Sequence, residues 1–119
     1  MIVGLGIDII EITRFKDDSP QFNSRCFTEA EQAYIKERGN ESKAGIFAAK
    51  EAIAKALGTG FRHGIMPRDI EIKHDGQNKP YASLHNAAES IAQGLGAKYV
   101  YVSITHNKTT AAAVAVIEK

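Results

Sequence analysis

One segment constrains the fold more than the rest of the sequence: residues 41–57, ESKAGIFAAKEAIAKAL. It has no proline and carries small or apolar side chains around most of a helical circumference, and Gly58-Thr59-Gly60 predicts its end. A helix that is apolar on nearly all sides is normally buried. The only arc that we expect to reach water carries Lys43 and Lys50. The segment is therefore predicted to form a long buried helix.

Glu51 and Lys55 are the exception on this helix, because they lie one turn apart on the side opposite Ile53. Their neighbours on that side are small or apolar: Ala44, Phe47, Ala48 and Ala52. An ordinary interpretation is an i, i+4 pair on a surface helix, which contributes about 0.2–0.5 kcal/mol. In apolar surroundings, however, a charged group must be paired or must bind a ligand. The spacing alone leaves both interpretations open.

Composition excludes several classes of protein. A chain of 119 residues is expected to form one domain over 1–119, and its modest core leaves oligomerisation as a source of further burial. With 15 basic and 14 acidic residues, it is not a dedicated nucleic-acid binder. The single Cys26 excludes an internal disulfide and a cysteine zinc cluster. No apolar run reaches membrane-spanning length, so we expect a cytoplasmic protein.

Residues 2–8 predict a buried strand with two different faces. One face carries Val3, Leu5 and Ile7, and the other carries Gly4, Gly6 and Asp8. Glycines let another group approach the backbone closely, just where the Asp8 carboxylate emerges at the strand end. Asp8 is either the N-cap of a short helix that reaches about Lys16, or part of a binding site.

The other segments complete an α+β fold, in which an antiparallel sheet packs on the long buried helix. A run of alanines in the last strand indicates that a neighbour packs very close to it. Asn107-Lys108 is a candidate two-residue hairpin turn, since asparagine tolerates positive φ. The expected segments are a helix with a Thr28–Glu31 capping box over 28–37, strands at 70–73 and 80–82, an amphipathic helix over 84–95, and strands at 99–106 and 109–117.

Asp8 and Glu51 are carboxylates without a neighbouring cysteine or histidine, a donor set that suits a hard cation such as Mg²⁺. Lys55, one turn from Glu51, suits a phosphate held by the same metal. His106 lies at the predicted hairpin tip, where a histidine is either a solvated loop residue or a functional group. The other histidines show no metal-ligand spacing and are expected at the surface: His63, His74 and His85.

Three segments together resemble the holo-acyl-carrier-protein synthases: GIDIIEITRF, FAAKEAIAKALGTG and VSITH. They match that family in order and spacing over essentially the whole chain. The family transfers 4′-phosphopantetheine from coenzyme A to a serine of apo acyl carrier protein, with Mg²⁺, in support of fatty acid biosynthesis. Its small members are homotrimers with sites between subunits. The resemblance implies the 4′-phosphopantetheinyl transferase fold, this activity with release of 3′,5′-ADP, and these partners.

The resemblance also implies a role for each matching residue. Asp8 and Glu51 correspond to the family's metal-binding carboxylates, and Lys55 corresponds to the lysine that contacts the coenzyme A phosphates. His106 corresponds to the histidine that reaches those phosphates from the neighbouring subunit. Catalysis would then depend on Glu51, Lys55 and His106. The general base remains open between Glu51 itself and a water on the metal.

Contacts with coenzyme and carrier are implied in the same way. The segment Lys79-Pro80 resembles the family's adenosine-contacting turn. Gly58 and Gly60 would let the backbone approach the coenzyme, although glycine at a helix end needs no function. Arg14 corresponds to the basic residue that contacts the acidic carrier. The basic residues expected to form this docking patch are Arg14, Lys16 and Arg25.

The chain departs from the family at three positions. Ile46 stands where the family commonly has arginine, which removes one cationic contact to the substrates, and Lys43 is the nearest cation that could partly substitute. Asn78 replaces the glycine of the family's GKP turn, a mild change because asparagine tolerates left-handed backbone. Asn107 stands where some members have aspartate. Two rival functions stay open: a Mg²⁺ enzyme that cleaves a pyrophosphate with water, and a non-catalytic oligomer that binds coenzyme A or a nucleotide.

Overall fold

The computed structural model describes residues 1–15 and 19–119. In chain order its elements are β1 (Ile2–Glu11), the 3-10 turn η1 (Ile12–Phe15), α1 (Pro20–Cys26), α2 (Glu29–Arg38), α3 (Asn40–Ala56), the 3-10 turn η2 (Pro67–Asp69), β2 (Ile70–His74), β3 (Pro80–Leu84), α4 (Asn86–Gly94), β4 (Tyr99–His106) and β5 (Thr110–Glu118). Every strand pairing is antiparallel, which confirms the expected α+β class. None of the helices in these two ranges is long and apolar enough to cross a membrane.

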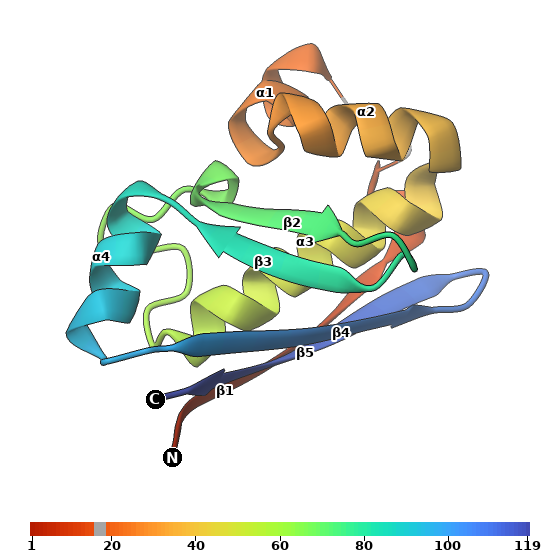
Figure 1. Cartoon of the computed structure of the whole chain (residues 1–119). Helices are drawn as coiled ribbons and strands as arrows, with labels where there is room; N and C mark the ends of the chain where they lie inside the picture. Colours follow the sequence, from red (N-terminus) through yellow and green to blue (C-terminus); the bar gives the residue numbers. More distant parts are fainter. Residues whose placement is uncertain (16–18) are drawn as a thin grey trace.

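Helix α3 lies between two layers of strands (Figure 1). On one side is the three-stranded sheet, in the order β1-β5-β4, and on the other is the two-stranded hairpin of β2 and β3. Helices α1 and α2 lie over the N-terminal end of α3. From Lys43 to Ala56, every residue of α3 except Glu51 and Lys55 is buried, so the prediction of a long buried helix is confirmed.

The backbones of α3 and β1 approach each other at Gly4 and Gly6. A β-carbon at Gly4 would collide with the carbonyl oxygen of Ala56, and one at Gly6 would collide with that of Ala52. The group that approaches the glycine face of β1 is therefore the backbone of α3. The alanine run of β5 acts in the same way, because its inward-facing members are buried beneath the helix: Ala111, Ala113 and Ala115.

Strand β1 differs from its prediction in length and in burial. It extends to Glu11, so Asp8 lies inside the strand and does not cap a helix. The face opposite the glycines is open, with Leu5 68%, Ile7 67% and Ile9 72% exposed. The prediction of a buried strand was therefore wrong for this face. The strand is followed by η1, and Lys16, the predicted end of a short helix, lies outside the described residues.

Helix α1 and the β4–β5 loop differ from the sequence prediction, whereas one helix cap agrees with it. Helix α1 was not predicted, although Ser19 caps it by accepting a hydrogen bond from the Phe22 amide at 3.1 Å, with Pro20 at its first position. The β4–β5 loop spans 107–109, one residue more than expected. Asn107 has no positive φ there; its Oδ1 accepts the amides of Thr109 and Thr110 at 2.9 and 2.8 Å. The Thr28–Glu31 capping box is confirmed.

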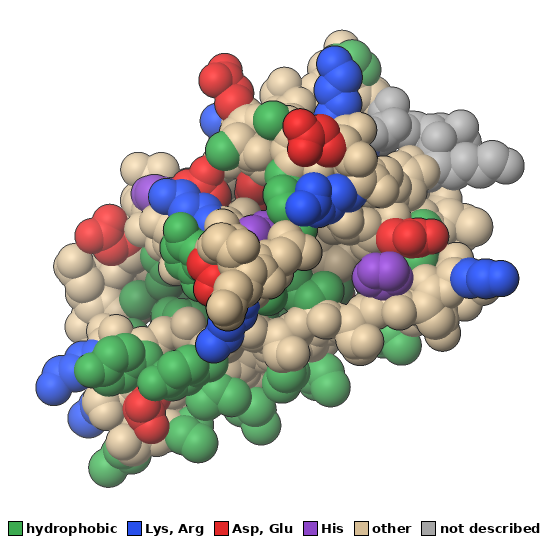
Figure 2. Space-filling model, turned by 45° about the vertical axis from the view of Figure 1, so that its right-hand side comes forward, with side chains coloured by type: hydrophobic (Ala, Val, Ile, Leu, Met, Phe, Trp, Pro, Cys, Tyr) green, Lys and Arg blue, Asp and Glu red, His purple; other side chains and the backbone are tan. Residues whose placement is uncertain are grey.

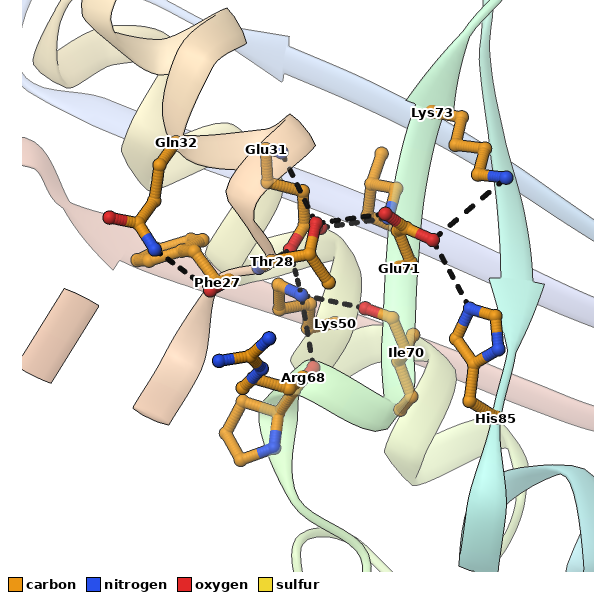
Figure 3. Close-up of polar contacts among 12 residues, drawn as sticks. Phe27, Thr28, Glu31, Gln32, Lys50, Arg68, Ile70, Glu71, Lys73 and His85 are labelled. Carbon is orange, nitrogen blue, oxygen red and sulfur yellow. Dashed lines mark hydrogen bonds and ion pairs between the residues drawn. The ribbon is translucent and has the colours of Figure 1, made fainter. Parts of the chain in front are cut away.

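Lys50 and Lys43 are buried, which corrects the expectation that they face water: Lys50 is 0% and Lys43 is 2% exposed. The Lys50 ammonium donates to Glu31 Oε1 at 2.8 Å and to the carbonyl oxygens of Pro67 and Ile70 at 3.0 and 2.7 Å (Figure 3). Burial lowers the pKa of Lys50, and the Glu31 carboxylate opposes that shift. This ion pair ties α3 to α2 and to β2.

Lys43 extends into an aromatic cluster. Its ammonium donates to Asn23 Oδ1 at 2.7 Å. It also lies 5.6–5.8 Å from the ring centroids of Phe15, Phe22 and Phe27. These partners come from η1, α1 and the residue after α1, none of which the helical pattern of 41–57 could predict.

The contact between α3 and β1 predicts that Gly6 cannot carry a side chain. Gly6→Ala should lower the free energy of unfolding by at least about 2 kcal/mol, because its methyl group meets backbone atoms of α3 that cannot move aside. Gly94→Ala is the matched control, since a methyl group there meets nothing within 4 Å. Urea denaturation of the two variants measures the difference. Equal stability would contradict the proposed close contact.

Candidate functional site

Lys55 pairs with Asp8 across the interface between α3 and β1. Its ammonium lies 3.2 Å from Asp8 Oδ1 and donates to the Ile7 carbonyl oxygen at 3.0 Å. The Lys55 side chain is 50% exposed and that of Asp8 is 14% exposed. Among the described residues, the carboxylate within ion-pair distance of Lys55 is that of Asp8, so the i, i+4 interpretation with Glu51 was wrong.

Glu51 is half-buried beside the same pair. Burial raises the pKa of Glu51 and the nearby Asp8 carboxylate raises it further, while Arg14 and Lys55 oppose the shift. A cation between Glu51 and Asp8 would oppose this shift, because it would stabilise the ionised form of Glu51. Asp8 and Glu51 offer carboxylate oxygens, which suit a hard divalent cation. Within the described part of the chain, no three acidic, histidine or cysteine side chains gather as a metal site, so such an ion would need other ligands from water or substrate.

His106 lies away from these carboxylates. Asp8 is on β1 and His106 is on β4, with β5 between them. Asp8 pairs with Ala113, which pairs with Ile104, so His106 is two residues farther along its strand. Ordinary sheet spacings then place the two α-carbons roughly 12 Å apart. A single copy of the chain therefore does not bring His106 to Asp8.

A hollow of about 190 Å³ surrounds His106. Pro80, from the segment expected to contact adenosine, lies in its wall, and Lys79 is exposed just before it. The full lining is Tyr34, Glu41, Ser42, Gly45, Ile46, His74, Asn78, Pro80, Ile104 and His106. The predicted site residues thus form two groups within one chain: Asp8, Glu51 and Lys55 in one, and Pro80 and His106 in the other.

The turn before Pro80 is held by side-chain contacts that the sequence did not predict. Asn78 has a φ of 64° and its Oδ1 accepts the Tyr34 hydroxyl at 2.8 Å. Asp75 Oδ1 accepts the amides of Gln77 and Lys79, both at 2.9 Å. The His74 ring stacks on Tyr34 at 4.0 Å between centroids.

Two of the histidines expected at the surface have partners. His74 is half-buried in its stack with Tyr34, and burial lowers its pKa. His85 is half-buried and its Nε2 lies 3.1 Å from Glu71 Oε1. His63 is exposed, as expected. Tyr34 and Glu71, the partners of His74 and His85, are distant from them in sequence, so no spacing pattern could have predicted these contacts.

Ile46 is 1% exposed and lines the hollow that contains His106. No lysine or arginine belongs to the described lining. Lys43 points elsewhere, into a separate hollow with Asn23 and Phe27. The expectation that Lys43 replaces a cationic side chain at position 46 was therefore wrong.

The remaining predicted residues lie at edges of the site. Gly58 and Gly60 follow α3 with φ of 87° and 59°, and open space surrounds both. The positive φ at these two positions is by itself a sufficient reason for glycine there. The Arg14 guanidinium lies 5.4 Å from the Phe47 ring centroid, and Arg25 is exposed in the last turn of α1. Lys16 lies outside the described residues.

An apolar face was also missed. The side of the three-stranded sheet that turns away from α3 exposes large apolar side chains: Leu5, Ile7, Ile9, Tyr99, Tyr101 and Val114. Hydrophobic side chains gather along the lower side of the molecule in Figure 2. A contiguous apolar patch of this kind marks an interaction surface. The sequence shows which side chains of a strand share a face, but it does not show which face turns away from α3.

Known proteins resemble this chain over its full length. A model of the 4′-phosphopantetheinyl transferase superfamily matches residues 4–115. The holo-[acyl-carrier-protein] synthase of Alkaliphilus oremlandii is 47% identical over 121 residues, which cover 98% of this chain and 98% of the relative. The crystal structure of holo-[acyl-carrier-protein] synthase from Neisseria meningitidis has a TM-score of 0.89 at 34% identity, covering 100% of both chains.

A second solved structure was determined with a ligand. It is a holo-(acyl-carrier-protein) synthase from Bacillus anthracis in complex with CoA (3′,5′-ADP). Its TM-score is 0.82 at 37% identity, and the match covers 98% of this chain and 96% of that one. The fold expected from the sequence resemblance is therefore confirmed.

The raised pKa of Glu51 predicts a pH-dependent stability without divalent cations. When folding raises the pKa of a carboxyl group, the folded state resists its ionisation. The free energy of unfolding therefore falls as the pH rises above the pKa of that group in the unfolded chain. Glu51→Gln should therefore unfold at higher urea concentration than wild type near neutral pH, with the advantage fading below about pH 4. Glu37→Gln, exposed on α2, is the control and should change little. An advantage that persists unchanged at low pH would contradict the prediction.

Proposed function

Since the chain belongs to the holo-acyl-carrier-protein synthases of the 4′-phosphopantetheinyl transferase superfamily, we propose that it transfers 4′-phosphopantetheine from coenzyme A to a serine of apo acyl carrier protein. The transfer releases 3′,5′-ADP and supports fatty acid biosynthesis in the cytoplasm. The observation that carries the proposal is the pair of carboxylates, Asp8 and Glu51, set beside the Lys55 ammonium. Residues 1–119 act as one transferase domain.

Asp8 and Glu51 would hold Mg²⁺ through their carboxylate oxygens, and the pKa of Glu51, which burial and the Asp8 carboxylate raise, supports this role. The bound ion would draw charge from the phosphate oxygens of coenzyme A. Lys55 is held by one carboxylate and one carbonyl oxygen and is half exposed, so its ammonium can turn toward a phosphate. There it stabilises the charge that develops on the departing 3′,5′-ADP. The candidates to accept the serine proton are Glu51 itself and a water on the metal.

The nucleotide part of coenzyme A would occupy the second group of residues. His106 and Pro80 line one hollow, and Lys79 is exposed at its edge. His106 would stabilise phosphate charge, while Lys79 and Pro80 would contact the adenosine. Gly58 and Gly60 leave open space in which the coenzyme can pass close to the backbone.

We propose a homotrimer, with each site shared between two copies. The roughly 12 Å separation of Asp8 and His106 within one copy supports this arrangement, since the histidine must then come from a neighbour. The exposed apolar face of the three-stranded sheet supplies a surface through which copies can associate. Arg14 and Arg25, both exposed, would dock the acidic carrier.

A transfer assay tests the proposed function and its metal ligands. Wild type incubated with coenzyme A, Mg²⁺ and apo acyl carrier protein should increase the carrier mass by one phosphopantetheine group. Asp8→Asn and Glu51→Gln keep the side-chain shape but remove a charge, so each should abolish Mg²⁺-dependent turnover while the fold persists. Release of 3′,5′-ADP without carrier would instead support hydrolysis, and the absence of both products would support binding alone.

Mixing of inactive subunits tests the shared site. Glu51→Gln and His106→Ala subunits, each inactive alone, should recover part of the activity after exchange, because some interfaces then contain an intact Glu51 opposite an intact His106. The carrier mass assay measures the recovery, and subunit exchange is verified by native mass spectrometry. Two Glu51→Gln preparations mixed together are the control. No recovery despite exchange would place each site within one chain.

A further inference from the structure

A second hollow, of about 520 Å³, lies where α1, η2 and the start of α4 meet. It is separate from the carboxylate pair and from the hollow around His106. Its lining is Ser24, Arg25, Thr28, Met66, Arg68, Asp69, His85 and Asn86. In Figure 3, Arg68 and Thr28 are drawn on one side of strand β2, and His85 is drawn on the other side, beside β3.

The acidic groups at this hollow are already engaged. Asp69 is 7% exposed and accepts the Met66 amide and the Asn86 side-chain amide, both at 3.0 Å. Glu71, behind the lining, accepts the Thr28 hydroxyl at 2.8 Å and contacts His85 at 3.1 Å. Burial acts to raise the pKa of Glu71, but these hydrogen bonds outweigh it and lower the pKa. Hydrogen bonds from amide and hydroxyl groups do not remove a carboxylate's charge, but neither Asp69 nor Glu71 lies within ion-pair distance of Arg25 or Arg68.

The arginines, in contrast, keep most of their donors. Arg68 Nη1 donates to the Ser24 carbonyl oxygen at 2.7 Å, which leaves the rest of its guanidinium available. Arg25 is exposed one residue farther along α1. No carboxylate in residues 1–15 or 19–119 lies within ion-pair distance of either arginine. The rim of the hollow therefore offers guanidinium donors that have no ion-pair partner among the described residues, and these donors favour an anionic acceptor.

The form of the hollow favours a protein side chain over a small free anion. Both arginines are exposed at its rim, and neither is a buried charge that could enclose a phosphate. Met66, 48% exposed, adds an apolar surface beside them. The hydrogen bond to Ser24 holds the Arg68 guanidinium in place, which lowers the entropy lost on binding a carboxylate.

We propose that this hollow binds an acidic side chain of the carrier protein, with Arg68 as a docking residue that extends the α1 surface around Arg25. The inference rests on the proposed transfer to an acyl carrier protein and names a further part of that interface. Charged contacts at the edge of an interface act mainly on association and its salt dependence. Arg68 therefore determines the affinity for the carrier, and it has no part in the chemical step.

Arg68→Glu tests this role in two measurements. The Kd for apo carrier without coenzyme A, measured by calorimetry, should rise about tenfold, and the KM for carrier should rise in parallel. The kcat and the KM for coenzyme A should stay at wild-type values. Lys98→Glu is the matched control, because Lys98 is exposed directly before β4 and its amide donates to the Glu118 carbonyl oxygen of β5. The sheet of β4 and β5 lies away from α1 (Figure 1). The control should bind the carrier like wild type.

Further variants separate the possible failures. Arg68→Ala removes the charge without adding a carboxylate and should weaken carrier binding by a smaller factor, even where Arg68→Glu does not fold. Arg68 variants that bind carrier like Lys98→Glu would overturn the inference and leave the transfer activity intact. Wild type that modifies no carrier would overturn the proposed function itself. A different outcome is that inorganic phosphate raises the urea concentration at which wild type unfolds and fails to do so for Arg68→Ala. If the carrier affinity of Arg68→Ala were then unchanged, the hollow would be a small-anion site, which would also overturn the inference.

Discussion

The close contact between the backbones of α3 and β1 is the constraint on which the site depends. Gly4 faces Ala56 and Gly6 faces Ala52, so the helix approaches the strand without intervening side chains. Glu51 and Lys55 directly precede those two alanines in the sequence. The approach therefore brings both charged side chains to the strand that carries Asp8. A β-carbon at either glycine would push the helix outward and separate the three groups.

The opposite side of α3 is held by a buried ion pair. Lys50 precedes Glu51 and is bound to Glu31 and to two carbonyl oxygens around η2 and β2. Glu31 in turn accepts the Ile72 amide at 2.8 Å. Such a pair adds little net stability over an apolar contact, but removal of one partner leaves a buried charge uncompensated. It therefore determines which side of the helix meets α2 and, with it, which side meets Asp8.

One copy of the chain leaves two features incomplete. The outer face of the three-stranded sheet is apolar and exposed, and His106 lies at the sheet edge opposite the strand of Asp8. The proposed association of copies would account for both, because it would bury apolar surface and would bring a histidine from one copy to the carboxylates of another. The modest core of a small domain makes such burial valuable for stability.

Local patterns in the sequence determined the α+β class, the buried helix, the capping box of Thr28 and Glu31, and the three charged residues Asp8, Glu51 and Lys55. These follow from periodicity, from caps, and from charges placed among apolar neighbours. Only the tertiary structure decided that Lys50 is buried against Glu31, that Lys55 pairs with Asp8 and that Leu5 faces outward. The physical reason is that a buried charge is stabilised by a partner from another element, and an apolar strand face looks the same in sequence whichever side the helix covers.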